Sequence, residues 1–316
     1  MGLLNILPPP PSKKINWPWT RESNQHAPKK IDGGNWPRIS IVTPSYNQGC
    51  YIEETIRSVL LQNYPNLEYI IIDGGSTDES VEIIKKYEPW LTYWGSEPDR
   101  GQSHAINKGF ARCSGDILGW LCSDDILLNG SLEFVANNMK LDSSCWMIGG
   151  VKGYDERSGV TFCRPIPQSF GMINFLLWQS MSIAQPSVFW TRHLLDVTGS
   201  LHEDLHYCMD QDLWLRFFRV VPPTFAGCYL SRYRRHENAK TTSYSHHYQK
   251  LLTESSSWLL DVLNQESHGS RRTETVEALM EMQRRAIAWQ RLKEHIVIGR
   301  ILKWWQKFIN HELPTR

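Results

Sequence analysis

Residues 41–80 read IVTPSYNQGCYIEETIRSVLLQNYPNLEYIIIDGGSTDES, and this stretch contains two apolar runs separated by a segment of helical character. The first run, residues 38–43, is rich in β-branched side chains and predicts a buried strand that leads into the polar sequence PSYN. Residues 51–62 place their apolar side chains on one helical face. Residues 67–73 are apolar almost throughout, as in a strand buried on both faces of a parallel sheet. The stretch therefore predicts a β-α-β unit.

The alternation of strand and helix continues beyond residue 80. A helix capped by Ser76, Thr77 or Asp78 precedes a short strand, a further helix and another strand, predicted at residues 76–87, 91–94, 102–111 and 116–121. Repeated units of this length predict a parallel sheet with right-handed crossovers, and such sheets bind ligands beyond the carboxyl ends of their strands. The polar sequences PSYN, DGGSTD, EPDRGQ and SDD all follow predicted strands. We therefore expect them to converge on one edge of the sheet.

The chain divides by composition into an arm, a central domain and a C-terminal extension. Residues 1–36 are rich in Pro, Lys, Asn and Trp without a regular period, which indicates an irregular arm or a disordered tail. Residues 37–267 form the predicted domain, whose second half is less regular, with expected strands near 187–190 and 224–230 and a helix near 210–219. Residues 268–316 read as a basic, Trp-rich helical extension. Its amphipathic pattern suits a membrane interface, packing on its own domain, or contact with a second subunit in a homo-oligomer.

Composition excludes several classes of protein. The formal net charge of +1 over 316 residues provides no broad electrostatic surface for nucleic acid. The seven cysteines include no C-x-x-C pair, which argues against a zinc site or a disulfide framework and favours a reduced, cytoplasmic setting. The apolar-then-basic order of the N-terminus is the reverse of a secretory signal, and no run approaches the roughly 20 apolar residues that span a bilayer. Neither a glycine-rich dinucleotide loop nor a P-loop is present.

An acidic pair follows the predicted strand at residues 116–121. Ser123-Asp124-Asp125 places two adjacent carboxylates at the end of that strand, where they repel each other unless a cation lies between them. Oxygen ligands of this type suit a hard divalent ion such as Mg²⁺ or Mn²⁺. Asp-Asp is common on protein surfaces, but its position after an apolar strand in a β-α series favours a metal site.

These motifs, together with EPDRGQSHAINKGFARCSGD and LGWLCSDD, resemble the nucleotide-binding half of the family-2 glycosyltransferases, which have the GT-A fold. The resemblance is strong over residues 38–130 and continues more weakly to about residue 244. It implies an α/β fold with a mainly parallel central sheet flanked by helices. Within the domain, residues 37–130 would then be the nucleotide-binding half and residues 131–267 the acceptor and catalytic half.

The resemblance also implies which residues bind the nucleotide sugar. Asp73 would contact the base or ribose, since a carboxylate can accept a hydrogen bond from an N–H of uracil, or it would cap a turn. Arg100 would place a cation near the nucleotide, or form a surface ion pair. Many relatives read Asp-Asp-Gly-Ser where this chain has Asp73-Gly74-Gly75-Ser76, so one carboxylate of that pattern is missing. The expected binding residues are Thr43, Pro44, Tyr46, Asp73, Gly75, Arg100, Gly101, Ser123 and Asp124.

The resemblance further implies metal ligands and a catalytic base. Asp125 would bind the metal directly, and His236, in the sequence YRRHE, would approach the metal or pyrophosphate unless its role is structural. The segment YCMDQDLWLR resembles a motif, usually Glu-Asp-x-Asp, that supplies the base. On that alignment Asp210 is the base and Met209 replaces the usual Glu. Asp212 is the alternative base; its competing role is to cap or pair within its own helix.

Together these features predict an inverting, metal-dependent glycosyltransferase that uses Mn²⁺ or Mg²⁺. It would move one sugar from a nucleotide-diphosphate sugar, with a UDP-sugar favoured, to a hydroxyl of a glycan or lipid-linked saccharide in cell-surface polysaccharide or lipopolysaccharide assembly. A processive synthase is disfavoured because no Gln-x-x-Arg-Trp motif and no spanning segment occur. The alternative is a catalytically inactive nucleotide-sugar-binding module of a larger assembly. The expected location is the cytoplasm, with peripheral contact at the inner face of the membrane through the C-terminal segment.

Overall fold

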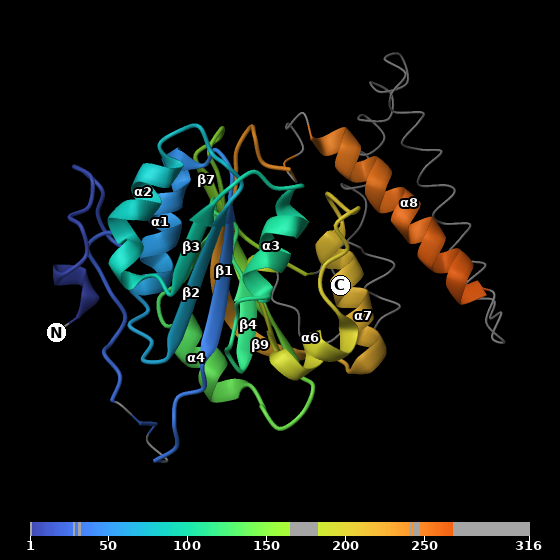
Figure 1. Ribbon diagram of the computed structural model, residues 1–316, viewed down its shortest axis with the longest axis horizontal. Helices are drawn as coiled ribbons and strands as arrows, with labels where there is room; N and C mark the ends of the chain where they lie inside the picture. The colour runs from blue at the N-terminus through green and yellow to red at the C-terminus, as the bar shows by residue number, and fades with distance from the viewer. Residues whose placement is uncertain are drawn as a thin grey trace, which may run out of the picture. The chain divides into compact units, whose positions relative to one another are not determined.

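The computed structural model describes residues 2–27, 29–30, 33–164, 183–240, 242 and 247–267. The chain divides into two compact units, residues 1–251 and 252–316. The sheet and the polar loops at its edge belong to the first unit (Figure 1). The C-terminal extension predicted for residues 268–316, including its proposed membrane contact, lies outside the described residues. Among the described helices, none is both long enough and apolar enough to cross a bilayer.

The described strands form one mixed sheet in the order β3-β2-β1-β4-β8-β6-β9-β5, with β7 paired to β6. Strands β3, β2, β1 and β4 are all parallel, whereas β8 runs antiparallel to both β4 and β6. The strands are β1 Ile39–Ser45, β2 Leu67–Asp73, β3 Tyr93–Ser96, β4 Ile117–Trp120, β5 Ile126–Leu127, β6 Trp146–Asp155, β7 Val160–Cys163, β8 Val188–Thr191 and β9 Thr224–Arg235. The predicted α/β fold with a mostly parallel sheet is confirmed.

Helices cover both faces of the parallel part of the sheet, with α1 and α2 on one face and α3 on the other (Figure 1). This arrangement follows from right-handed crossovers, because the chain moves from β1 to β2 to β3 in one direction and then returns past β1 to β4. The helices are α1 Gly49–Leu60, α2 Ser80–Tyr87, α3 Gln102–Phe110, α4 Ser131–Asn138, α6 Arg192–Thr198, α7 Met209–Val220 and α8 Tyr248–Ser267. Short 3₁₀ helices are η1 Leu3–Asn5, η2 Glu88–Trp90 and η4 Gln185–Ser187.

A cluster of buried aromatic rings fixes α7 against the sheet. Trp214 of α7 stacks on Trp120 at the end of β4, with ring centroids 5.4 Å apart and planes inclined by 14°. Trp146 of β6 stacks on Trp214 with centroids 5.9 Å apart. Such large apolar side chains contribute both buried area and directional ring contacts. Because Asp210 lies one helical turn before Trp214, this packing also directs the start of α7 toward the end of β4.

The N-terminal arm packs against α1 through a buried arginine. Arg57 has no exposed surface and donates hydrogen bonds to the carbonyl oxygens of Pro8, Pro18 and Trp19 at 2.8 to 3.1 Å. A buried guanidinium is tolerated only when its donors are satisfied, so these carbonyls and the hydroxyl of Tyr87 keep the arm in place. The sequence does not reveal this packing, because the arm has no periodic pattern.

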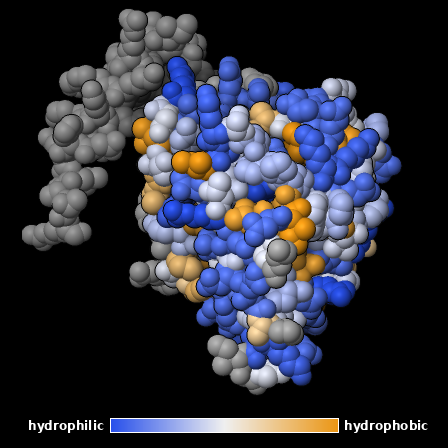
Figure 2. Space-filling view, turned by 90° about the vertical axis from the view of Figure 1, so that its left-hand side faces the viewer, coloured by the Kyte–Doolittle hydropathy of each residue, from blue (hydrophilic) through white to orange (hydrophobic). Residues whose placement is uncertain are grey.

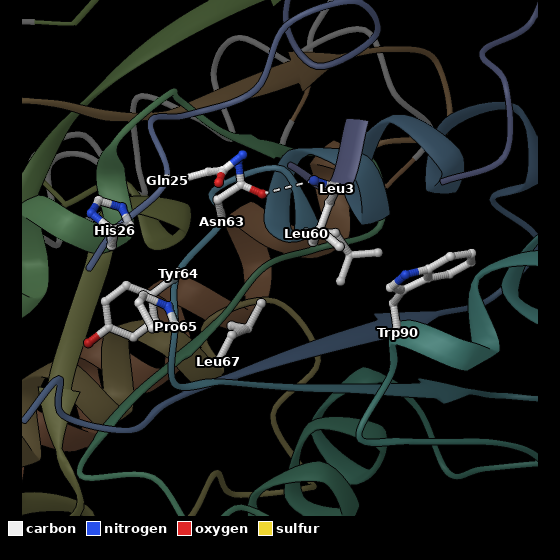
Figure 3. Close-up of a pocket in the computed structure, with 9 residues that line it drawn as sticks. All are labelled: Leu3, Gln25, His26, Leu60, Asn63, Tyr64, Pro65, Leu67 and Trp90. Atoms are coloured by element: carbon white, nitrogen blue, oxygen red, sulfur yellow. Dashed lines mark hydrogen bonds between the residues drawn. The ribbon is translucent and has the colours of Figure 1, made fainter. Parts of the chain in front are cut away.

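A cavity of about 330 Å³ lies beneath the arm. Asn63, which follows α1, accepts a hydrogen bond from the backbone N–H of Leu3 at 3.4 Å (Figure 3). The residues that line the cavity are Leu3, Gln25, His26, Leu60, Asn63, Tyr64, Pro65, Leu67 and Trp90. Figure 2 shows the arm's side of the molecule, where hydrophobic residues lie in small groups among hydrophilic ones. Since Leu67 begins β2, this cavity is at the amino edge of the sheet, opposite the polar loops.

Candidate functional site

The turn after β2 is organised by the side chain of Asp73, which has no exposed surface. Its Oδ2 accepts hydrogen bonds from the backbone N–H groups of Gly75 and Ser76 at 3.1 and 2.8 Å and from Ser96 Oγ at 2.7 Å. Its Oδ1 accepts the Ser76 hydroxyl at 2.6 Å. Gly75 has a φ of +83°, which favours glycine in this turn. The structure therefore gives Asp73 the turn-forming role that the sequence offered as an alternative, while its contact with a nucleobase stays a prediction.

The loop after β1 is joined to that turn by hydrogen bonds. The backbone N–H of Asn47 donates to Ser76 Oγ at 2.8 Å, and the Asn47 side-chain oxygen accepts the N–H of Thr77 at 2.9 Å. Of the predicted binding residues in the β1 segment, Thr43 and Pro44 are buried, whereas the Tyr46 side chain is 62% exposed. Tyr46 is therefore the aromatic ring of this segment that a planar base can reach.

The loop after β3 contains Asp99, Arg100 and Gly101. Gly101 has a φ of +116°, and its N–H donates to Asp99 Oδ1 at 2.7 Å at the start of α3. Arg100 extends outward, with 70% of its side chain exposed, and its Nη2 lies 2.5 Å from Glu203 Oε2. The structure thus shows the surface ion pair that the sequence offered as the competing role of Arg100, and nucleotide binding by Arg100 stays a prediction.

The acidic pair follows β4 in a loop held by α1. The Thr55 hydroxyl lies 2.8 Å from the carbonyl oxygen of Ser123 and 2.7 Å from that of Asp125. Asp125 is buried, and its Oδ1 accepts the backbone N–H of Arg234 at 3.1 Å. Burial raises the pKa of Asp125 well above its usual range, and the adjacent charge of Asp124 raises it further. Two carboxylates held together in a desolvated loop are a setting that a divalent cation would stabilise.

The ligand atoms around this loop fit a cation site. Cys122 Sγ and carboxylate oxygens of Asp124 and Asp125 all lie within 4.8 Å of one another. His236, predicted as a metal ligand, is buried, and its Nε2 lies 2.9 Å from Asp124 Oδ2. The structure thus brings His236 to the acidic pair and adds Cys122, which the sequence analysis did not select. The two carboxylates suit Mg²⁺ or Mn²⁺, and the thiol is the softer donor of the group.

A clamp of α1 and β9 side chains, which we define as Tyr51, Glu54 and Arg234, holds His236 in this position. The Tyr51 ring contacts the His236 ring, with centroids 4.6 Å apart, and the Arg234 guanidinium lies over the Tyr51 ring, 4.9 Å from its centroid. Glu54 binds both Arg234 and Arg232 at 2.7 Å. The sequence analysis missed the clamp, although Tyr51, Glu54 and Thr55 are spaced to share one helical face.

Asp210 belongs to the same site as the acidic pair. It lies in the first turn of α7 and is partly buried. Burial raises the pKa of the Cys122 thiol well above its usual range, and the charges of Asp125, Asp124 and Asp210 raise it further. All three carboxylates therefore act on one thiol at the end of β4.

The opposing charge at this thiol comes from Lys240, which lowers the pKa of Cys122. Lys240 Nζ donates to Gln102 Oε1 at 3.0 Å, and Gln102 Nε2 donates to Cys122 Sγ at 3.2 Å. The sequence analysis selected neither residue. Lys240 follows the end of β9 and lies outside the motifs selected from the sequence, so only the fold reveals that its charge acts near the acidic pair.

Asp212, the alternative base, has a different environment. Its Oδ2 lies 2.9 Å from Arg216 Nη2, one helical turn later, and 3.1 Å from His202 Nδ1. Its side chain is 13% exposed. These ion pairs match the structural role that the sequence allowed for Asp212, and the choice of Asp210 as the base stays a prediction.

Comparison with known proteins yields a family model and several relatives. The model described as glycosyl transferase family 2 matches residues 40–192. An uncharacterized glycosyltransferase of Mycobacterium tuberculosis is 33% identical over 201 residues, covering 62% of this chain and 75% of that protein. Another from Rickettsia prowazekii is 31% identical over 218 residues, covering 66% of each chain. The crystal structure of TarS from S. aureus in complex with UDP-GlcNAc superposes with a TM-score of 0.56 at 18% identity, covering 77% of this chain and 70% of that one, a likeness of fold.

Proposed function

Because the chain belongs to glycosyl transferase family 2, we propose that it is an inverting, metal-dependent enzyme that moves one sugar from a UDP-sugar to an acceptor hydroxyl. The family establishes a glycosyltransferase that uses nucleotide-sugar donors. The observation that carries the finer proposal is the cluster of Cys122, Asp124 and Asp125 beyond the end of β4, which the charge of Asp210 also reaches from the first turn of α7. Asp124 and Asp125 would hold a cation, and Asp210 would act on the reacting hydroxyl.

The loops after β1, β2 and β3 would hold the nucleoside. They are joined to one another by hydrogen bonds, and Tyr46 exposes an aromatic face on which a planar base can stack. Since β1 lies between β2 and β4 in the sheet, a nucleotide extending from these loops would bring its diphosphate toward the acidic pair. The UDP-GlcNAc complex of TarS motivates the choice of a uridine donor.

Asp125 and Asp124 would hold the divalent metal, with His236 fixed beside them by the clamp. When bound, Mn²⁺ or Mg²⁺ would stabilise the negative charge that develops on the departing diphosphate. Asp125 is buried and hydrogen-bonded to the Arg234 N–H, so its carboxylate is positioned before any ligand arrives. Preorganisation of this kind avoids the cost of rearranging the loop during the reaction.

Asp210 would be the catalytic base. It would take the proton from the acceptor hydroxyl while that oxygen bonds to the anomeric carbon and the bond from that carbon to the diphosphate oxygen breaks. One base without a covalent nucleophile gives inversion in a single displacement. We further propose a glycan or lipid-linked saccharide as the acceptor, in cell-surface polysaccharide or lipopolysaccharide assembly on the cytoplasmic side of the membrane.

The donor site is tested by the thermal stability of the full chain with UDP, GDP, CDP or dTDP, each with and without Mn²⁺. We expect UDP with Mn²⁺ to raise the melting temperature of the wild type and to have no such effect on Asp125→Ala. Without ligand, Asp125→Ala should be as stable as the wild type or more so, because it removes a buried carboxylate. A folded wild type that responds to none of the nucleotides would contradict the proposal.

Turnover separates the enzyme from the alternative, an inactive binding module. The wild type is incubated with UDP-sugars, Mn²⁺ and a panel of glycan and lipid-linked acceptors, and UDP release is followed. Nucleotide binding that depends on Asp125, without release of UDP above the Asp210→Asn background for any acceptor, would favour the binding module.

A further inference from the structure

The carboxylate of Asp99 occupies the space beside Gly74 where any other residue would carry its side chain. A Cβ atom placed on Gly74 would lie 3.1 Å from Asp99 Cγ and only 2.5 Å from Asp99 Oδ2, and the latter is closer than Cβ atoms approach their neighbours. Gly74 is not among the residues with a positive φ, so its backbone does not demand glycine. A side chain at position 74 would therefore have to displace the Asp99 carboxylate, which is the end of a flexible side chain.

Asp73 and Asp99 differ in how many hydrogen bonds their carboxylate oxygens already accept. Asp73 has no exposed surface, and its Oδ2 already accepts three hydrogen bonds. Asp99 is only partly buried, and its Oδ1 accepts the N–H of Gly101 at 2.7 Å. Within the described part of the chain, Asp99 Oδ2 has no hydrogen-bond donor. Of the two carboxylates, Asp99 is therefore the one whose Oδ2 can accept a hydrogen bond from a ligand.

The position of Asp99 relative to the three loops places that acceptor at the nucleoside end of the site. The N–H of Gly74 donates to the carbonyl oxygen of Ser45 at the end of β1 at 2.8 Å, and the N–H of Glu97 donates to that of Asp73 at 3.1 Å. Asp99 thus lies against the turn that joins the ends of β1, β2 and β3. The acidic pair lies on the other side of β1, after β4.

We propose that Asp99 recognises the nucleoside of the donor by accepting a hydrogen bond, from an N–H of the base or from a ribose hydroxyl, while Asp73 shapes the turn beneath it. This inference rests on the proposed function and reassigns the contact predicted for Asp73. Asp99 supplies a carboxylate from the loop after β3 to the space beside Gly74.

The test is the affinity for UDP in the presence of Mn²⁺, measured by calorimetry on the full chain. Asp99→Asn retains an oxygen for the Gly101 N–H but removes the charge, so the loop should keep its shape. We expect about 10- to 100-fold weaker binding, the range for one hydrogen bond to a charged group. Asp142→Asn, which alters an exposed carboxylate outside these loops, is the matched control and should bind like the wild type.

A transplanted carboxylate distinguishes recognition from a structural role. Gly74→Asp alone should weaken binding, because its side chain displaces the Asp99 carboxylate from its position. Gly74→Asp combined with Asp99→Gly relieves the collision and returns a carboxylate to the same space, so it should bind UDP more tightly than Asp99→Gly alone. Equal binding by these last two variants would count against the proposal.

Ligand analogues identify which group Asp99 contacts. If it accepts from the base, 3-methyl-UDP should bind the wild type more weakly than UDP does, and Asp99→Asn should not discriminate between the two. If it accepts from the ribose, 2′-deoxy-UDP should show that pattern. Unchanged UDP affinity in Asp99→Asn, with Asp125→Ala still deficient, would overturn the role of Asp99 and leave the proposed function standing. Absence of nucleotide binding by the wild type would overturn both.

Discussion

Strands β2 and β4 flank β1 and both lead into aspartates, yet the two loops use their carboxylates in opposite ways. After β2, donors from Gly75, Ser76 and Ser96 surround Asp73. After β4, Asp125 receives one backbone N–H and lies beside another carboxylate. A carboxylate at a strand end therefore supports the local fold where its own loop provides the donors. Where the loop itself provides fewer donors, as after β4, we propose that the carboxylate serves a ligand.

The largest expected effect is on turnover at Asp210, which tests whether the carboxylate that α7 brings toward the loop after β4 is the catalytic base. Asp210→Asn should lower the rate of sugar transfer by about 10²- to 10⁴-fold, the usual contribution of a general base, while UDP binding is retained. Asp212→Asn is the matched control: it disrupts ion pairs with Arg216 and His202, so it should lower stability and leave the rate much less affected. The measurement is single-turnover transfer together with a thermal melt of each variant. The reverse pattern would make Asp212 the base.

The next effect is on stability, and it concerns the loop after β2. Asp73→Asn replaces one charged acceptor oxygen with an NH₂ group in a site filled by donors. We expect the free energy of unfolding to fall by about 2 to 4 kcal/mol, because hydrogen bonds to a buried charged group are lost. Asp99→Asn, measured in the same urea titration, should be much less destabilising. A stable Asp73→Asn protein with weakened UDP binding would restore Asp73 as the nucleoside contact.

Much of the parallel part of the sheet could be predicted from the sequence. The alternation of apolar strands and amphipathic helices predicted β1 to β4 and α1 to α3 within a few residues, because periodicity reports on which side chains are buried. It also identified the SDD sequence by its place after a strand. Helix α8 was not predicted, because its sequence includes the weakly helix-forming run ESSS. The sequence analysis also missed the hold of Arg57 on the arm, since that contact joins residues distant along the chain.

Within the site, residues were missed for the same reason: their contacts join segments that are distant along the chain. Glu54 meets Arg232 and Arg234 only because β9 returns beside β5 and β6. The role of Asp99 depends on the absence of a side chain at Gly74, which leaves room for the Asp99 carboxylate. The spacing of motifs in the sequence does not reveal this contact. Sequence patterns identify the polar strand ends, whereas the number of donors around each carboxylate follows only from the fold.

A smaller effect is expected in the clamp, which supports the loop after β4 from α1. Glu54→Gln weakens contacts with Arg232 and Arg234, so we expect a loss of about 1 to 3 kcal/mol in stability, below that of a fully buried pair because the arginines keep some exposure. Mn²⁺-dependent UDP binding should weaken as well, since the backbone of Arg234 holds Asp125. Glu156→Gln is the comparison variant; Glu156 is more exposed and contacts Arg234 and the Tyr51 hydroxyl but forms only one ion pair, so its effect should be smaller. Equal losses would show that Glu54 has no special role in the clamp.

The smallest effect is expected at Arg100, where both the charge and its partner are at the surface. The hydrogen bond from Arg100 lowers the pKa of Glu203, so the pair contributes to stability at neutral pH, and the contribution is lost as the pH falls through that lowered pKa. An exposed pair is worth at most about 1 kcal/mol and is screened by salt. Arg100→Ala and Glu203→Gln should therefore melt close to the wild type, with differences that shrink in 1 M NaCl, a concentration at which the screening length is about 3 Å.

UDP affinity then decides between the two roles of Arg100. If the ion pair is its whole role, Arg100→Ala and Glu203→Gln should both bind UDP within about twofold of the wild type, since that difference is below 0.5 kcal/mol at about 1.4 kcal/mol per tenfold. A loss of about tenfold in Arg100→Ala, absent in Glu203→Gln, would show that the guanidinium leaves Glu203 to reach the nucleotide. The loop after β3 would then provide two groups that bind the donor, the guanidinium of Arg100 and the carboxylate of Asp99. In that case the charged side chains of this loop would both stabilise the fold and bind the ligand, unlike those of the loops after β2 and β4.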